Sequence, residues 1–86
     1  MAKIVNKLVI SAFPTSPINA IIQNDNDDTI FRKKFWTPSF EKEIVKILDE
    51  HAEVEEIYIF GSKKYVGHLS DTVRNLTDLP IFEEGI

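Results

Sequence analysis

The amino-acid sequence predicts a small α/β domain in which a mixed β-sheet with the element order βββαβαβ carries two helices. Short runs of β-branched and aromatic residues, separated by residues typical of turns, indicate the strands. Two longer segments, residues 37–52 and 62–76, repeat apolar residues at the spacing of an amphipathic helix. With 86 residues, of which 43% are hydrophobic and 28% charged, the chain suits a single domain over residues 1–86 with one modest core.

The first half of the chain predicts a meander of antiparallel strands. Residues 4–12 form the first strand, which ends before Pro14 and Pro17 because prolines fix φ and remove backbone donors. A second strand follows over residues 18–23. The Asn- and Asp-rich residues 24–28 then form a polar turn, and they lack the glycine and the final glutamate of an EF-hand calcium loop.

The third predicted strand, residues 29–36, has two different faces. Because side chains alternate along a strand, we expect one mainly aromatic face and one basic face. The mainly aromatic face consists of Phe31, Lys33 and Phe35. The basic face consists of Ile30, Arg32, Lys34 and Trp36. Two cations beside an indole could stack a base and neutralise a phosphate. The alternative interpretation is an edge strand whose basic side chains discourage aggregation, while the tryptophan covers a helix end.

A first helix is predicted to begin at Thr37 and Pro38, with threonine as the N-cap and proline at the first helical position. Phe40, Ile44 and Ile47 recur at helical spacing and form an apolar stripe. This stripe should pack against the sheet.

A strand-to-helix junction follows this helix. Residues 56–60 are apolar enough for a strand buried on both faces. Gly61 permits a tight turn, and Ser62 is a suitable N-cap for a second helix. The free N–H groups of its first turn, together with Lys63 and Lys64, would face the carboxyl end of the strand, where open α/β sheets bind anionic ligands. Alternatively, the junction simply joins two core elements.

The second predicted helix has an apolar stripe that consists of Val66, Leu69, Val73 and Leu76. Gly67 costs this helix about 1 kcal/mol of propensity relative to alanine, so close packing or a ligand is the expected reason for it. His68 and Ser70 lack the acid that would orient a catalytic histidine. A short strand over residues 79–82 and an acidic tail over residues 83–86 complete the chain.

Composition excludes several classes of function. The chain has no cysteine, which excludes disulfides, thiolate metal sites and cysteine nucleophiles. Its net charge of -4 disfavours binding to a long nucleic acid, because such binding rests on many contacts from Lys and Arg to phosphates. No apolar segment is long enough to predict a signal peptide or a membrane span. We therefore expect a cytoplasmic protein that is not an enzyme and has no cofactor or metal.

The element order resembles a reduced ribonuclease-H-like fold with the spatial strand order 3-2-1-4-5, over nearly the whole chain. Nucleases of that fold hold divalent metal ions with several carboxylates, one on the first strand and another at the end of the fourth. The corresponding residues 9–12 and 60–62 contain no acid. The resemblance therefore implies the fold without the nuclease activity.

Two segments are both basic and aromatic, namely FRKKFW at residues 31–36 and FGSKKY at residues 60–65. In a small acidic chain without cysteine, they resemble an accessory early protein of a T4-like bacteriophage, and in particular the anti-CBASS family that sequesters host cyclic dinucleotides. This resemblance implies an anti-defence sponge that captures an immune messenger, without turnover, in the cytoplasm of the bacterial host. The alternative is an inhibitor or adaptor of a host protein, anchored by Phe35, Trp36 and Tyr65.

For the nucleotide-binding hypothesis, residue chemistry assigns eight ligand-binding residues. The backbone of Gly61 and Ser62 would contact phosphate, the cations would be Arg32, Lys34, Lys63 and Lys64, and the stacking platforms would be Trp36 and Tyr65. Because a small chain has little concave surface of its own, we expect a homo-oligomer with the ligand at the interface between copies.

Overall fold

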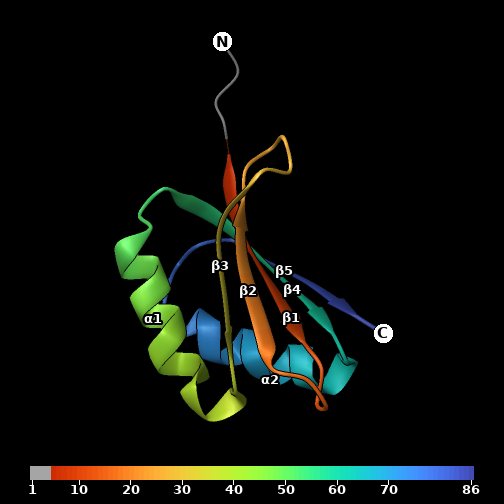
Figure 1. Ribbon diagram of the computed structural model, residues 1–86. Coiled ribbons are helices and arrows are strands. Elements are labelled where there is room, and N and C mark those ends of the chain that lie inside the picture. Colours follow the sequence, from red (N-terminus) through yellow and green to blue (C-terminus); the bar gives the residue numbers. More distant parts are fainter. Residues whose placement is uncertain (1–4) are drawn as a thin grey trace.

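The computed structural model describes residues 5–86 and shows a two-layer architecture, in which a twisted five-stranded sheet packs against two helices (Figure 1). The predicted start of the first strand at Ile4 lies outside the described residues. The elements are β1 (Asn6–Ala12), β2 (Ile18–Gln23), β3 (Thr29–Phe35), the 3-10 turn η1 (Thr37–Ser39), α1 (Phe40–Glu50), β4 (Val54–Gly61), α2 (Lys63–Arg74) and β5 (Ile81–Gly85). Neither helix in this part of the chain is long and apolar enough to cross a membrane.

The strands are arranged in the order β3-β2-β1-β4-β5. β1 and β2 are antiparallel, as are β2 and β3, whereas β4 runs parallel to both of its neighbours, β1 and β5. The hairpins follow from the short turns, and the parallel pairs follow from the helical crossovers. The predicted fold class and strand order are therefore confirmed. β3 lies at the edge of the sheet, as expected if its basic side chains discourage aggregation.

One face of the sheet carries the hydrophobic core, which also takes in both predicted helical stripes. In β1, for example, Leu8, Ile10 and Ala12 are fully buried, while the residues between them are not. The core cluster comprises Leu8, Ile10, Ala12, Ile18, Ala20, Ile22, Phe35, Phe40, Ile44, Ile47, Val54, Ile57, Ile59, Val66, Leu69 and Val73. Because these side chains form one cluster, α1 and α2 cover the same face of the sheet.

The opposite face of the sheet is covered by no element among residues 5–86, and we call it the open face. The prediction that the fourth strand is buried on both faces is therefore wrong. Ile57 and Ile59 of β4 are 0% and 1% exposed, but Phe60 is 37% exposed on the open face. An apolar run such as residues 56–60 also occurs in strands with helices on both faces, so composition alone did not distinguish the two cases.

The start of the first helix also differs from the prediction. Thr37 is not its N-cap, because the 3-10 turn η1 precedes α1 and Ser39 occupies the N-cap position without a side-chain hydrogen bond. The Ser39 N–H donates to the carbonyl of Trp36 (2.9 Å), and this bond tightens the chain directly after β3. The hydroxyl of Thr37 is thereby free to face Tyr65 on α2, at 3.5 Å.

The two glycines singled out above have opposite surroundings. Gly61 has a φ of 142°, and a Cβ at this position would lie 2.1 Å from the carbonyl oxygen of Ala12. Only glycine fits there. In contrast, a Cβ on Gly67 would meet nothing within 4 Å, so the expectation of close packing at Gly67 is wrong.

The end of the chain belongs to the sheet. Glu83 and Glu84 lie within β5, so the prediction of an acidic tail is wrong. The Ile86 N–H donates to the carbonyl of Gly61 (2.9 Å) and extends the pairing of β5 with β4. Backbone pairing at a sheet edge tolerates glutamates because their side chains reach solvent, and Glu83 also pairs with Arg74 of α2 at 2.7 Å.

Candidate ligand-binding site

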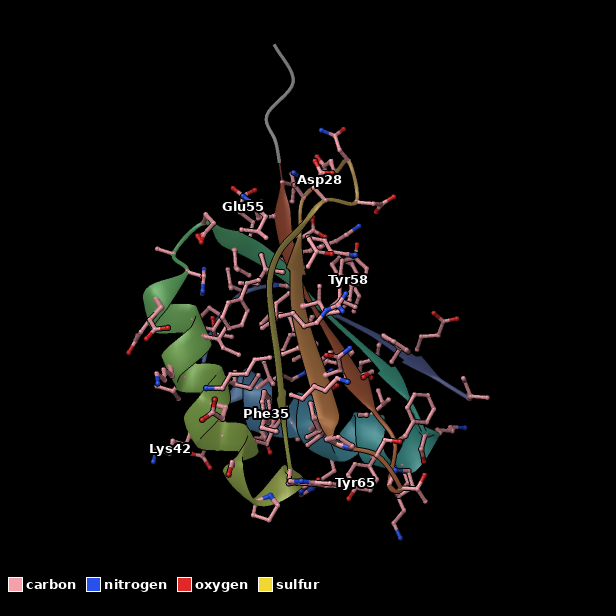
Figure 2. The ribbon with its side chains drawn as sticks, viewed as in Figure 1. Asp28, Phe35, Lys42, Glu55, Tyr58 and Tyr65 are labelled. Atoms are coloured by element: carbon pink, nitrogen blue, oxygen red, sulfur yellow. The ribbon has the colours of Figure 1, made fainter. Side chains whose placement is uncertain are left out.

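A hollow of about 450 Å³ lies at the end of the sheet where β1 and β4 finish and α2 begins, and we call it the α2 hollow. Its lining combines a cation, a phenol, an imidazole and two hydroxyl groups. The residues that line it are Pro14, Thr37, Ser62, Lys64, Tyr65 and His68. Figure 2 shows Tyr65 at this end of the sheet, with Asp28 at the opposite end. The volume is in the range of sites for small molecules.

The chain geometry at Gly61 builds one wall of this hollow. After the positive-φ turn, the Ser62 N–H donates to the carbonyl of Ala12 (3.0 Å), which ties the start of α2 to the end of β1. The Ser62 carbonyl then accepts from the N–H of Val66 (2.8 Å) and begins the helix. Ser62 makes no side-chain cap hydrogen bond. The N–H groups of the first turn therefore lack an intrahelical acceptor and carry the partial positive charge of the helix start.

Tyr65 and His68 continue the lining along α2. The Tyr65 hydroxyl faces that of Thr37 (3.5 Å), so the two side chains join α2 to η1 beside the hollow. A smaller hollow of about 170 Å³ adjoins it and shares Thr37 and His68. A ligand in the α2 hollow could therefore extend toward Glu41 in the first turn of α1, which also lines the smaller hollow.

Half of the predicted ligand-binding residues are at the α2 hollow. Ser62, Lys64 and Tyr65 line it, and Gly61 forms the turn that places them. Lys63 lies on the other side of the helix start, where a Cβ built on Gly85 of β5 would be 2.9 Å from its Cα. Adjacent lysines on a helix point in different directions, so only one of them can face a given hollow.

The other predicted residues belong to a different part of the molecule. Arg32 and Lys34 are exposed on the open face of β3. Trp36 is 61% exposed between β3 and η1 and is not among the lining residues of the α2 hollow. The sequence analysis missed His68 as a lining residue. Its spacing of three residues from Tyr65, on the same helix face, was the available signal.

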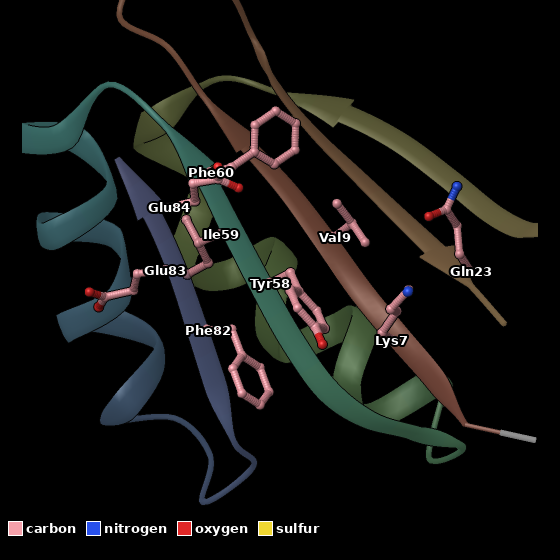
Figure 3. Close-up of a pocket in the computed structure, with 9 residues that line it drawn as sticks. All are labelled: Lys7, Val9, Gln23, Tyr58, Ile59, Phe60, Phe82, Glu83 and Glu84. Carbon is pink, nitrogen blue, oxygen red and sulfur yellow. The ribbon is translucent and has the colours of Figure 1, made fainter. Parts of the chain in front are cut away.

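The open face contains a second hollow, of about 370 Å³, around Tyr58 (Figure 3). The Tyr58 ring stacks on Phe82 of β5, with centroids 4.8 Å apart and an interplanar angle of 21°. Across the sheet, the Lys7 ammonium lies 5.5 Å from the centroid of the same ring. The Tyr58 hydroxyl donates to a carboxylate oxygen of Glu56 (3.0 Å), and this hydrogen bond raises the pKa of Tyr58.

Carboxylates do not gather at the positions that the ribonuclease-H-like resemblance points to. β1 and β4 bring Ser11 and Phe60 side by side there. Within residues 5–86, no group of three or more His, Asp or Glu side chains is placed to hold a metal ion. The α2 hollow instead offers hydrogen bonds, one positive charge and an aromatic ring, which are the means of binding an anion attached to a planar group.

Comparison with known proteins adds no family to this description. No protein-family model matches the sequence, and no curated protein is significantly similar to it. The resemblance to accessory proteins of T4-like bacteriophages therefore stays a prediction.

Proposed function

We propose that this protein is a non-catalytic binding protein that sequesters a small anionic nucleotide in the α2 hollow, with a cyclic dinucleotide immune messenger as the leading ligand. One observation carries the proposal: Ser62, Lys64 and Tyr65 converge on one hollow at the start of α2. The N–H groups of the first turn and the Lys64 ammonium suit a phosphate, and the Tyr65 ring suits a base. Binding without turnover fits the hydrogen bonds of residues 5–86, none of which joins a hydroxyl of the hollow to the His68 imidazole.

The setting of this function follows from the phage resemblance and the composition. A stoichiometric sponge acts where the messenger is made, which is the cytoplasm of a bacterial host. The net charge of -4 favours a ligand with few phosphates over a long polyanion, because the cations are local. Four of the eight predicted residues lie away from the α2 hollow, which leaves Lys64 as its only predicted cation. A ligand with two phosphates would therefore require the α2 hollow of a second copy for its other phosphate.

The adjacent lysines at the start of α2 provide the test. Calorimetric titration with a panel of cyclic dinucleotides and linear nucleotides should show saturable binding of one cyclic species, recovered intact afterwards. Lys64→Gln should weaken this binding about tenfold or more, which is about 1.4 kcal/mol. Lys63→Gln is the matched control, because it removes the same charge from the same helix turn outside the hollow, and its effect should be at least threefold smaller.

Two results would contradict the nucleotide proposal. Absence of binding across the panel by correctly folded protein would reject it. Equal losses in the two lysine variants would reject the α2 hollow as the site, because they would indicate a diffuse effect of charge.

Inhibition of a host protein is the second candidate function. The large exposed indole of Trp36 favours it, because exposed tryptophans commonly anchor protein interfaces. Phe35, which the sequence analysis placed in the same anchor, is 8% exposed in the core and cannot contribute. Trp36→Ala should abolish capture of a host protein under this function while leaving nucleotide titrations unchanged.

A further inference from the structure

The open face carries exposed apolar side chains although no described element covers it. Among residues 5–86, seven large hydrophobic side chains are exposed, and three of them, Ile30, Phe60 and Phe82, belong to strand positions that point to this face. A fourth, Phe13, packs its ring edge-on against Phe60 with centroids 6.3 Å apart. Exposed apolar clusters of this kind mark interaction surfaces.

The charged side chains of the open face differ in sign between its two edge strands, whereas Lys7 and Glu56 lie between the edges and contact Tyr58. The strand pairing places one row of side chains across all five strands, and this row is Arg32, Ile21, Val9, Tyr58 and Phe82. The next row begins at Lys34 on β3 and ends at Glu84 on β5. The open face is therefore cationic at the β3 edge and anionic at the β5 edge. Between the edges, the first row is apolar or aromatic, and the second contains Asn19, Ser11 and Phe60. Among residues 5–86, neither Lys34 nor Glu84 takes part in an ion pair.

The Tyr58 ring near the middle of this face is not available for stacking with a base. Tyr58 has Phe82 against one side of its ring and the Lys7 ammonium on the other. Its hydroxyl is bound to Glu56, and Glu84 adds a second carboxylate to the face. Single-stranded nucleic acids also need a continuous positive track, and Glu56 and Glu84 interrupt any such track on the open face. A protein surface with the opposite charge gradient is the better occupant.

We propose that a second copy of this chain binds the open face, forming a two-fold symmetric dimer whose axis runs along β1. A rotation of 180° about this axis exchanges the two edges of the sheet and keeps the strand direction. The β3 edge of each copy therefore lies over the β5 edge of the other. Lys34 then lies over Glu84 of the other copy, Arg32 over the ring of Phe82, Ile21 over Tyr58, and Val9 over itself. A two-fold axis perpendicular to the strands would instead bring the basic β3 edges of the two copies together, and likewise the acidic β5 edges, which like-charge repulsion disfavours. Of the charged side chains, the axis along β1 brings only Lys7 near its own copy, and this ammonium lies over the Tyr58 ring.

The size and form of the face also suit a second copy. Five strands about 4.8 Å apart, each about six residues long at about 3.3 Å per residue, give a sheet roughly 20 Å by 20 Å. Two such faces stacked about 10 Å apart would form the core of a β-sandwich with aligned strands. Because the strands of both copies run in the same direction under this symmetry, the two α2 hollows open at the same end of the dimer. The interface itself does not depend on a bound nucleotide.

Reciprocal charge variants test both the interface and its symmetry. Sedimentation and light scattering of the wild-type chain, from low micromolar to high concentration, should show a monomer–dimer equilibrium. Lys34→Glu should weaken the dimer roughly tenfold or more, and Glu84→Lys should do the same, because each creates two like-charge contacts per dimer. The double variant carrying both changes should return to the wild-type dissociation constant. Circular dichroism would verify folding, and the exposed helix pair Lys46→Glu with Glu50→Lys would be the control for a generic charge effect.

Any other outcome contradicts either the proposed dimer or its two-fold axis. A wild-type chain that stays monomeric rejects the dimer and leaves the face to a different protein. Single variants that dimerise normally, or a double variant that stays weak, reject the two-fold axis along β1. Saturable binding of a single-stranded oligonucleotide that competes with dimer formation would assign the face to nucleic acid.

Discussion

Ile59 and Phe60 are neighbours in β4, yet one is 1% exposed against the helices and the other is 37% exposed on the open face. Both are large apolar residues, so hydrophobicity does not explain the difference. The path of the chain explains it. β3, β4 and β5 run in the same direction, and the chain crosses from β3 to β4 and then from β4 to β5 in the same sense. Because such crossovers are right-handed, α1 and α2 both lie on one face and leave the other without a cover.

Alanine substitutions at Ile59 and Phe60 test whether the two faces of the sheet differ in burial as described. Ile59→Ala should lower the free energy of unfolding by about 2–5 kcal/mol, because it opens a cavity in the core. Phe60→Ala should cost about half as much or less, roughly 1–2 kcal/mol, since water already reaches part of the ring. Urea unfolding at concentrations below self-association would measure both. Equal losses would mean that the open face is covered within the folded monomer.

A second comparison uses the two glycines. Gly61→Ala should destabilise the domain by about 1–3 kcal/mol, because alanine resists the positive φ and its Cβ would collide with Ala12. Gly67→Ala should stabilise it by up to about 1 kcal/mol, because the site is open and helical. Opposite shifts in the melting temperature are the expected result. Destabilisation by both would indicate that Gly67 has a contact that the monomer does not show.

The smallest expected effect concerns Lys33 and Lys34, which are neighbours on opposite faces of β3. Lys33 forms an ion pair with Glu43 of α1, and its hydrogen bond is the main cause of a lowered pKa for Glu43. A lowered pKa in the folded state adds stability above the unfolded-state pKa, and this contribution is lost as the pH falls through the folded-state value. NMR titration should show the pKa of Glu43 rising in Lys33→Gln and unchanged in Lys34→Gln. An equal rise in both would mean that net charge, rather than the ion pair, lowers this pKa.

Much of the fold was predictable because it depends on local signals. The turn at residues 24–28, the stripes of both helices and the strand-to-helix turn at Gly61 follow from residue types and spacing, and the structure confirms them. Asp27 even adopts the left-handed conformation that Asn and Asp tolerate in such turns. The burial of β4 on both faces and the acidic tail were wrong, because layer number and edge pairing are settled by distant parts of the chain.

The candidate site was predictable only in part for a similar reason. Ser62, Lys64 and Tyr65 come from one short segment, so their proximity follows from helix geometry. Arg32 and Lys34 come from a strand that the structure places on another face. Residue chemistry indicated what each side chain could bind, but it carried no information on which of them share a surface.

The sequence alone determined the alternation of strands and helices and the need for glycine at position 61, because these depend on periodicity and turn chemistry. The strand order was implied by the resemblance of this element order to a ribonuclease-H-like fold. Only the tertiary structure decided which apolar residues meet water. Both helices had to pack on the same side of the sheet before Phe60 became a surface residue, Lys33 an ion-pair partner of Glu43, and Lys34 part of an open charged edge.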